Sequence, residues 1–410
     1  MRPGATADDA VAYLSTPEAI RERTGAVLAA GLAGHLAHFT VDLSRLAATA
    51  DLVAAITRER YPGRSVPLHS RWRHFDVGGC DRVEALERLL GPLALDERVR
   101  AKIDLAVVSV LLDAGAGPRW HYHEAETGQR QARSEGLAVA SLRLFAAGFF
   151  SRDPAGRARV DADTLAAITD DRLGAALQVS TDNPLDGLSG RAALLRQLGG
   201  ALRGAPELFG TRAPRPGHLL DTLREKSDGG RVEAAEILRA VLAGFGPIWP
   251  GRLALGGVNL GDVWPHGAAG GVGPGAGLVP LHKLSQWLTY SLIEPLTEAG
   301  LGVSGLDRLT ALAEYRNGGL LIDTGVLTLR DPAVVSGRHR PGDELVVEWR
   351  ALTVALVDRL ARLVRERLAA PDLPLASILE GGTWAAGRRL ADERRGGAAP
   401  IRIESDGTVM

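Results

Sequence analysis

The stretch that decides the fold is AKIDLAVVSVLL, residues 101–112, which is apolar on nearly every side of a helix. A helix that is apolar all round has to be enclosed by other elements, so this segment predicts the centre of a hydrophobic core. Outward from it, apolar residues recur at three- and four-residue intervals, as in residues 43–59. The sequence therefore predicts a mainly α-helical fold.

Further helices are predicted along most of the chain. One begins after Thr16, a suitable N-cap residue that is followed by Pro17 at the first helical position. The best strand signal is the tail PIRIESDGTVM, residues 400–410, where alternating isoleucines precede an Asp-Gly turn and predict a short hairpin. The remaining helices are predicted at residues 135–150, 161–178, 188–203, 231–245, 281–299, 305–315, 318–329 and 343–368.

The chain is predicted to comprise an N-terminal helical region, residues 1–100, and a helical core, residues 101–410. Residues 204–230 are rich in proline, glycine and charge and are predicted to be a connector. The glycine-rich stretch 265–280 lacks both a Gly-Lys-Ser/Thr sequence and a preceding strand, so it does not match a phosphate-binding loop. It is either a mobile lid beside a pocket or a plain surface loop.

Composition limits the classes of function. With 48 basic and 49 acidic residues the net charge is −1, which favours neither nucleic acid nor an anionic membrane as a partner. A single cysteine, Cys80, permits no internal disulfide and fits a reducing compartment. There is no signal-peptide pattern, and the longest apolar run, Leu105–Leu112, is too short to span a bilayer. We expect a soluble, cytoplasmic protein with a small-molecule substrate; its oligomeric state is left open.

Polar residues gather in four clusters. The first is HSRWRHF, residues 69–75, where Arg71, Arg73 and His74 surround Trp72. Arginine side chains suit the recognition of phosphate or carboxylate groups. The alternative is a surface turn with Trp72 packed into the core.

The second cluster lies in residues 111–141. Asp113 ends the apolar helix and Glu135 opens the next one, and carboxylates at the ends of buried helices are costly unless they are paired or used. Trp120 and Tyr122 lie between them. The neighbouring His121 and His123 alternate as a metal-binding pair would, but no second ligand motif accompanies them, so no metal is predicted.

The third cluster follows the glycine-rich stretch. His282, Lys283 and Gln286 are expected on one face of a helix, next to Trp287. This polar stripe is either a solvated face or the wall of a pocket for a small polar molecule.

The fourth cluster is LTALAEYRNGGLLIDTGVL, residues 309–327, with DELVVEWRALTVALVDRL, residues 343–360. The pattern predicts a helix, an Asn-Gly-Gly turn and a second helix, with Glu314 at the joint and the free amides of Gly318 and Gly319 able to hold an anion. The alternatives are structural. Glu314 could pair with Arg350, Arg316 could pair with Glu348, and Asp323 could cap a turn.

Several stretches together resemble a family of uracil catabolism proteins, long carried as a domain of unknown function, from the pathway that opens the pyrimidine ring without reducing it. They are HSRWRHF, LLDAGAG, RSEGLAVAS, DNPL, LSQWLTYSLIEPL, AEYRNGGL, VVEWRALTVAL, LEGGTWAAGR and SDGTV. The fourth cluster also resembles, more distantly, the Asp-Tyr-Arg-Val-Pro-Gln segment and the Glu-x-Glu-x-Arg helix of queuosine salvage glycosidases. That resemblance implies a fold related to helix-hairpin-helix DNA glycosylases and metal-free hydrolysis of an N-glycosidic bond.

This chain departs from the glycosidase pattern, because Glu314 stands in place of the aspartate and Asn-Gly-Gly in place of Val-Pro-Gln. The substrate is therefore expected to differ, and the pathway implies a ribosylurea or its phosphate, cleaved to urea and the sugar. Breaking the ribosyl C–N bond builds positive charge on the sugar, which a fixed carboxylate stabilises. The resemblance requires no cofactor.

The candidate catalytic residues are Glu314, Asp323, Glu135 and Asp113, with the last two or His282 as proton donors. The candidate substrate-binding residues are Arg71, Arg73, His74, Trp120, Tyr122, His282, Lys283, Gln286, Trp287, Tyr315, Arg316, Gly318, Gly319, Glu348 and Arg350.

Two other functions are kept beside the hydrolase. One is a metal-dependent amidohydrolase that acts on a ring-opened pyrimidine nucleotide and uses His121, His123, His266 and His282 as ligands. The other is a non-catalytic helical subunit that binds a pathway intermediate.

Overall fold

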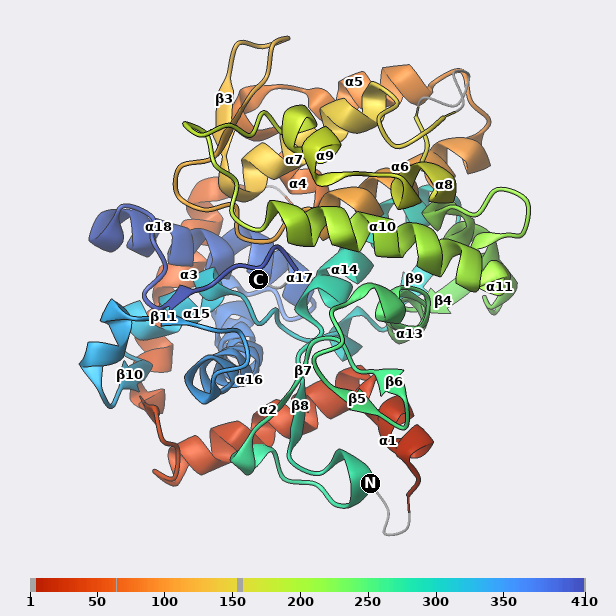
Figure 1. Ribbon diagram of the computed structural model, residues 1–410. Helices are drawn as coiled ribbons and strands as arrows, with labels where there is room; N and C mark the ends of the chain where they lie inside the picture. The colour runs from red at the N-terminus through yellow and green to blue at the C-terminus, as the bar shows by residue number, and fades with distance from the viewer. Residues whose placement is uncertain (1–4, 64, 153–157, 409–410) are drawn as a thin grey trace. The chain divides into compact units, whose positions relative to one another are not determined.

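The computed structural model describes residues 5–63, 65–152 and 158–408, and in these residues the chain is mainly α-helical, with strands only in short pairs (Figure 1). The predicted fold class is confirmed, whereas the relation to helix-hairpin-helix glycosylases stays a prediction. None of the helices in these ranges is long and apolar enough to cross a bilayer.

The chain forms two compact units, each assembled from separate stretches of sequence. The first unit contains the chain up to His69, Gly251–Gln286 and Gly305–Glu404, and the second contains Ser70–Pro250, Trp287–Ser304 and the tail from Ser405. The division into residues 1–100 and 101–410 stays a prediction.

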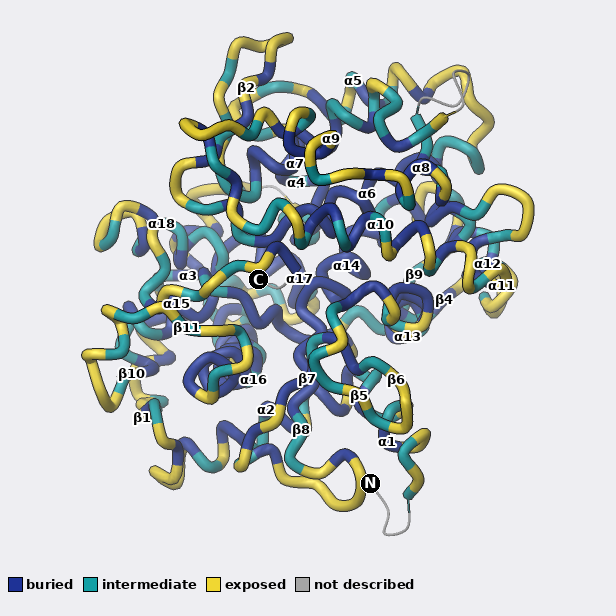
Figure 2. Tube along the Cα trace, in the orientation of Figure 1, coloured by how far each residue is buried: buried dark blue, intermediate teal, exposed yellow. Residues whose placement is uncertain are grey.

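The first unit is organised around the long helix α16 (Glu344–Leu368), whose apolar face is buried (Figure 2). It contacts α2 (Pro17–Leu32), α3 (Leu46–Arg60) and α15 (Tyr315–Asp323), and α15 in turn packs on α18 (Trp384–Arg395). Thr16 caps α2 through a hydrogen bond from the amide of Ala19, as predicted.

The other elements of the first unit are short. They are α1 (Ala7–Leu14), β1 (Phe39–Val41), η1 (Leu43–Arg45), β5 (Ala254–Leu255), β6 (Val258–Asn259), β7 (Val263–Pro265), η5 (Gly267–Ala269), η6 (Gly273–Gly275), β8 (Leu278–Pro280), η7 (Leu306–Arg308), β10 (Leu327–Leu329), η8 (Pro332–Ser336), β11 (Arg338–His339), α17 (Leu375–Ile378), the π-helical η9 (Leu379–Thr383) and β12 (Arg402–Ile403). The pairs β1–β10, β5–β6 and β7–β8 are antiparallel.

The second unit is organised around α6 (Leu95–Leu111), which contains the predicted core segment and is buried along most of its length (Figure 2). It contacts α7 (Arg133–Ala146), α10 (Leu188–Gly204) and α12 (Leu219–Glu225). Helix α14 (Lys283–Glu298) begins in the first unit and continues into the second.

The other elements of the second unit are α4 (Trp72–Phe75), η2 (Val77–Gly79), α5 (Arg82–Leu90), β2 (His121–His123), β3 (Arg130–Ala132), α8 (Ala162–Ala166), α9 (Asp170–Ala176), α11 (Pro206–Phe209), η3 (Pro216–His218), β4 (Arg231–Glu233), α13 (Ala234–Phe245), η4 (Gly246–Ile248) and β9 (Gly302–Ser304). Strands β2 and β3 pair antiparallel, and β4 and β9 pair parallel.

The helix predicted at residues 305–315 is wrong. After η7 the chain runs to Glu314 without regular structure, because side chains from other elements satisfy its backbone groups. Arg21 donates to the carbonyls of Asp307, Arg308 and Leu309. The amides of residues 310 and 311 donate to the side chains of Gln286 and Asp358.

Three other expectations are also corrected. The helix predicted at 161–178 is split into α8 and α9, and Asn317-Gly318-Gly319 lies inside α15 rather than in a turn. The tail forms no hairpin in its described part, since β12 pairs parallel with β11; residues 409 and 410 lie outside the described residues. Residues 204–230 lie inside the second unit, where the apolar face of α12 is buried, and their role as a connector stays a prediction.

Candidate functional site

Glu314 is the N-cap residue of α15 and is anchored by the backbone of that helix. Its two carboxylate oxygens accept hydrogen bonds from the amides of Arg316 at 2.8 Å and Asn317 at 2.6 Å. The amide of Gly318 donates to the Glu314 carbonyl oxygen at 3.1 Å. The predicted free amides at this helix end are therefore already engaged, and the carboxylate occupies the position expected for an anion.

Arg316 follows directly and is buried, with 3% of its surface exposed. Its guanidinium carbon lies 5.1 Å from the ring centre of Tyr315 and 5.0 Å from that of Trp384. Among the described residues, no group accepts a hydrogen bond from its Nη1 or Nη2. The predicted pairing of Arg316 with Glu348 is therefore wrong.

Gly318 and Gly319 serve helix packing in this structure. A Cβ atom on Gly318 would lie 2.7 Å from atoms of the Trp349 indole, and one on Gly319 would lie 3.4 Å from Pro400. The first approach is too close for a side chain, so the glycine allows α15 to contact α16.

A histidine–carboxylate pair that the sequence analysis missed also lies in the first unit. His69 Nδ1 is 2.9 Å from Glu380 Oε2, and both side chains are buried. Burial alone would raise the pKa of Glu380, but the hydrogen bond with His69 and the charge of Arg60 lower it below its ordinary value. The His69 ring lies 6.0 Å from that of Trp384, the residue that flanks Arg316.

The signal for this pair was a local one. Glu380 lies in the π-helical segment η9, within the LEGGTWAAGR stretch that carried the family resemblance but received no role. π-Helical segments are rare and are frequent at functional sites.

The other carboxylates and arginines of the fourth cluster have structural partners. Arg350 donates to both oxygens of Asp262 at 2.8 Å, so its predicted pairing with Glu314 is wrong. Arg395 binds both oxygens of Asp323 at 2.6 Å, which replaces the predicted turn cap. Glu348 is fully buried, and its carboxylate accepts hydrogen bonds from the backbone amides of residues 38 and 39.

The predicted polar face of α14 is not a solvated face. His282 precedes the helix with a φ of 44° and its Nε2 lies 3.0 Å from the Leu14 carbonyl oxygen. Burial lowers the pKa of His282, which favours the neutral ring. The buried Lys283 begins the helix and donates its amide to Asp262, and Gln286 binds Thr310 through both its amide nitrogen and its oxygen.

The second unit contains a separate buried ionic cluster that brings together five predicted site residues. Arg71 Nη1 lies 2.9 Å from Asp113 Oδ1, and the guanidinium carbon lies 5.5 Å from the ring centre of Trp287. The His74 ring lies 5.3 Å from the same indole. Burial lowers the pKa of Arg71, while the negative charges of Asp113 and Glu135 oppose that shift. Two buried carboxylates therefore face one guanidinium.

The loop that carries Asp113 is held by Arg191, which the sequence analysis did not single out. This fully buried arginine donates to the carbonyl of Leu112 at 2.9 Å and to that of Gly115 at 3.0 Å, and also to that of Ala114. Ser405 Oγ from the tail donates to the Gly115 carbonyl at 3.0 Å. Every residue has a backbone carbonyl, so the sequence does not indicate which carbonyls an arginine such as Arg191 will bind.

The remaining predicted residues of the second unit have other contacts. Arg73 pairs with Glu294, and the buried Trp120 donates its indole N–H to the carbonyl of Leu177 at 3.0 Å. Tyr122 lies in β2 and is 9% exposed. None of these contacts includes Arg71 or Asp113.

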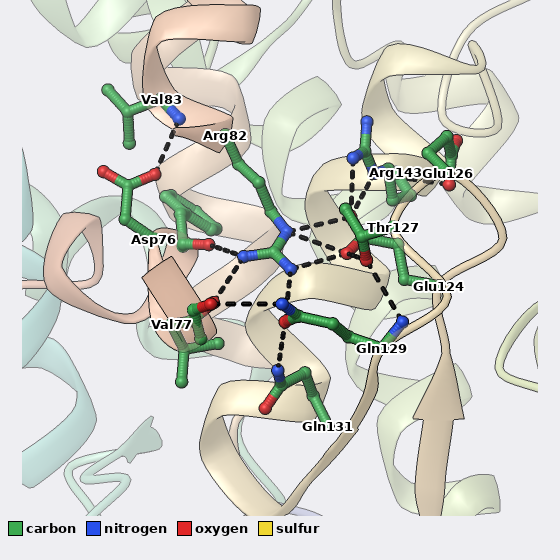
Figure 3. A network of polar contacts seen from close by, with 12 residues as sticks. Asp76, Val77, Arg82, Val83, Glu124, Glu126, Thr127, Gln129, Gln131 and Arg143 are labelled. Atoms are coloured by element: carbon green, nitrogen blue, oxygen red, sulfur yellow. Dashed lines mark hydrogen bonds and ion pairs between the residues drawn. The ribbon is translucent and has the colours of Figure 1, made fainter. Parts of the chain in front are cut away.

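A second ionic network in this unit, drawn in Figure 3, joins Arg82, Glu124 and Arg143. Arg82 Nε lies 2.8 Å and Arg143 Nε lies 2.6 Å from Glu124 Oε1, and Thr127 donates its hydroxyl to the same carboxylate. Burial would raise the pKa of Glu124, but these partners lower it to about 2. The network joins α5 and α7 to the β2–β3 hairpin.

The described residues contain no group of three or more His, Cys, Asp or Glu side chains placed to hold a metal ion. His282 contacts Leu14, as above, and His266 Nδ1 accepts the amide of Ala268 at 3.1 Å. His121 contacts Arg130. The donor set of the amidohydrolase alternative is thus not assembled in this structure.

Comparisons with known proteins agree over nearly the whole chain. A family model described as "Protein of unknown function (DUF1688)" matches residues 13–410. "Protein urg3" of Schizosaccharomyces pombe is 40% identical over 413 residues, which cover 98% of this chain and 99% of that protein. "Uracil catabolism protein 4" of Lachancea kluyveri is 39% identical over 440 residues, which cover 99% of this chain and 100% of that protein.

Proposed function

Because the chain belongs to the DUF1688 family, in which a full-length relative is named for uracil catabolism, we propose that it acts in uracil catabolism as an N-glycoside hydrolase. Its substrate in this proposal is a ribosylurea or ribosylurea phosphate, and its products are urea and the sugar. The reaction needs neither a metal nor a cofactor.

The observation that carries this proposal is the anchored carboxylate of Glu314. Glutamate is not among the preferred N-cap residues, and three other helices of this chain use threonine, at Thr6, Thr16 and Thr169. Capping alone therefore does not account for a glutamate at this position. Both oxygens of the Glu314 carboxylate are held by amides at the N-terminal end of the helix, so the carboxylate is fixed in position.

A fixed anion suits the cleavage of a ribosyl C–N bond. As the bond breaks, positive charge develops on the sugar, and a preorganised carboxylate stabilises that charge without rearranging. Water then adds to the anomeric carbon, and one of its protons passes to Glu314.

Urea leaves more readily as a neutral molecule, so the departing nitrogen needs a proton. In the same unit, the buried His69 is oriented by Glu380 through the 2.9 Å contact at its Nδ1. Histidine is the side chain most often used as a general acid, and a hydrogen bond to one ring nitrogen fixes the direction of the other. We assign His69 as the proton donor, with Glu380 as its positioning residue.

The cluster of the second unit is a second place where the same chemistry could occur. Asp113 and Glu135 supply two buried carboxylates around Arg71, and excess negative charge suits a developing cation. In that case Arg71 would orient Asp113, and Glu135 or His74 would donate the proton.

The test is a product assay with the purified protein. Synthetic ribosylurea and its 5′-phosphate are incubated with it, and free urea and free sugar are both quantified. The proposal predicts equimolar release of urea and sugar from at least one of the two. Binding without release would favour the non-catalytic subunit, and release of ammonia without free sugar would favour the amidohydrolase.

A further inference from the structure

The guanidinium of Arg316 is a buried positive charge that forms no ion pair with the described residues. The side chain is 3% exposed, and neither Nη1 nor Nη2 donates to any acceptor in the part of the chain that the structure describes. Burial of an ionised group is costly unless it is paired and hydrogen-bonded. The contrast with Arg350 is direct, since that buried arginine binds both oxygens of Asp262.

The contacts of the Arg316 guanidinium with the described residues are stacking contacts with two aromatic rings. The guanidinium carbon lies 5.1 Å from the Tyr315 ring centre and 5.0 Å from that of Trp384. Aromatic faces attract a cation, but they do not satisfy the N–H donors at the edge of its plane. The nearest acid in sequence, Glu314, directs both of its oxygens to backbone amides.

A second cation increases the local positive charge. The guanidinium carbon of Arg388 lies 5.4 Å from the ring centre of Trp384, the same indole that flanks Arg316. Two arginines beside one ring favour a ligand with more than one negative charge. The paired N–H groups of Nη1 and Nη2 match two oxygens of a phosphate group.

We propose that Arg316 is the centre of a binding site for a phosphate monoester, flanked by Tyr315 and Trp384. The identity of that monoester rests on the proposed function, under which it is the 5′-phosphate of the ribosylurea. The site would thereby select ribosylurea 5′-phosphate over unphosphorylated ribosylurea. The affinity for the phosphate group itself does not depend on catalysis.

The test measures binding by calorimetry and by thermal unfolding in buffer free of oxyanions. The probes are inorganic phosphate, sulfate, ribose 5-phosphate and ribose. We expect phosphate and ribose 5-phosphate to raise the unfolding temperature and ribose to leave it unchanged. Tighter binding of ribose 5-phosphate than of phosphate identifies a sugar phosphate as the ligand, and equal binding identifies the free anion.

Three variants separate the site from general stability. Arg316→Met should weaken phosphate binding at least about tenfold, as expected for the loss of a charge-assisted bidentate contact, and Arg316→Lys should recover only part of it. Without phosphate, Arg316→Met should be as stable as the wild type or more stable, because it removes an uncompensated buried charge. Arg395→Met is the control. Arg395 is the partner of Asp323, which lies in α15 with Arg316, and this variant should retain the phosphate response.

Three results would overturn the proposal. They are a wild-type protein that does not respond to phosphate, an Arg316→Met variant that still does, and an Arg316→Met variant that is strongly destabilised in phosphate-free buffer. The last would mean that the guanidinium has a protein partner. Phosphate binding without urea release would end the hydrolase proposal and leave the site intact.

Discussion

Arg71 and Asp113 form a buried ion pair, with Arg71 Nη1 2.9 Å from Asp113 Oδ1. In the other unit, Arg316 is also buried, but its Nη1 and Nη2 have no such acceptor among the described residues. The carboxylate of Asp113 compensates the buried charge of Arg71, whereas in our proposal a bound anion compensates that of Arg316. The two units therefore offer different tests, of ion pairing in one and of ligand binding in the other.

Replacement of Glu314 separates capping from catalysis. Glu314→Asp installs a better N-cap residue with a shorter reach, so the free energy of unfolding should stay constant or rise. Turnover should nevertheless fall by about a hundredfold, because a carboxylate that does not reach the sugar cannot stabilise its charge.

Glu314→Gln should lower turnover by a similar factor and cost about 1 kcal/mol of stability through the weakened cap. Both variants are measured by urea release and by chemical unfolding. An active Glu314→Asp variant would show that the residue is only a cap.

The second-unit cluster is tested with a matched pair of variants, one in α6 and one in the loop that follows it. Asp104 and Asp113 are both buried acids paired with a buried arginine, Arg215 and Arg71 respectively. Each change to asparagine removes one carboxylate from a buried arginine, although Arg215 keeps Glu97 and Arg71 keeps the charge of Glu135. Each variant should therefore lose up to roughly 3–5 kcal/mol of stability.

If the reaction occurs in the first unit, the folded fraction of both variants should turn over within about tenfold of the wild type. Turnover is measured at a temperature where each variant remains folded. A loss of about a hundredfold in Asp113→Asn alone would move the catalytic site to the second unit.

The network in Figure 3 predicts a pH dependence of stability. The pKa of Glu124 is lowered from 4.5 to about 2, so its stabilising contribution is present above the ordinary value and is lost as the pH falls toward 2. Unfolding by urea should show the wild type losing stability as the pH falls from 4.5 to about 2.

Glu124→Gln should be less stable at neutral pH, and its stability should depend less on pH in that window. The control is Glu126→Gln, since Glu126 is an exposed neighbour 3.7 Å from Arg143 Nε and contributes little. Equal pH profiles for the wild type and Glu124→Gln would contradict the assignment.

Metal removal should leave turnover unchanged. Of the histidines named for the amidohydrolase alternative, the His282 ring contacts the Leu14 carbonyl, His121 contacts Arg130, and His266 contacts the Ala268 amide and lies 3.6 Å from Glu348. Dialysis against a chelator, followed by elemental analysis and the urea assay, checks this expectation. Stoichiometric zinc, together with activity that is lost on its removal and restored on its addition, would establish the metal-dependent reading.

Part of this protein could be read from the sequence. The segment at residues 101–112 is apolar all round, and it is the core of α6 in the second unit. Thr16 with Pro17 marked the start of α2 correctly. These features are local, because helix periodicity and capping depend on residues a few positions apart.

Partner choice could not be read in the same way. Opposite charge suggested Arg350 as a partner for Glu314 and Arg316 as a partner for Glu348. Arg350 instead binds Asp262, which lies 88 residues earlier in the chain. Charge types alone allow many pairings, and only the packing of α16 against the segment near Asp262 selects one.

The sequence by itself determined the helical class, the positions of most helices and the identity of the residues with unusual charge. Tertiary structure decided which of those charges are compensated: Asp323 and Arg350 have partners, and Arg316 has none in the described chain. It also turned residues 309–314 from a predicted helix into an irregular segment, because Gln286 and Asp358 take the hydrogen bonds of its amides. Such bonds join residues far apart in sequence, so no local pattern encodes them.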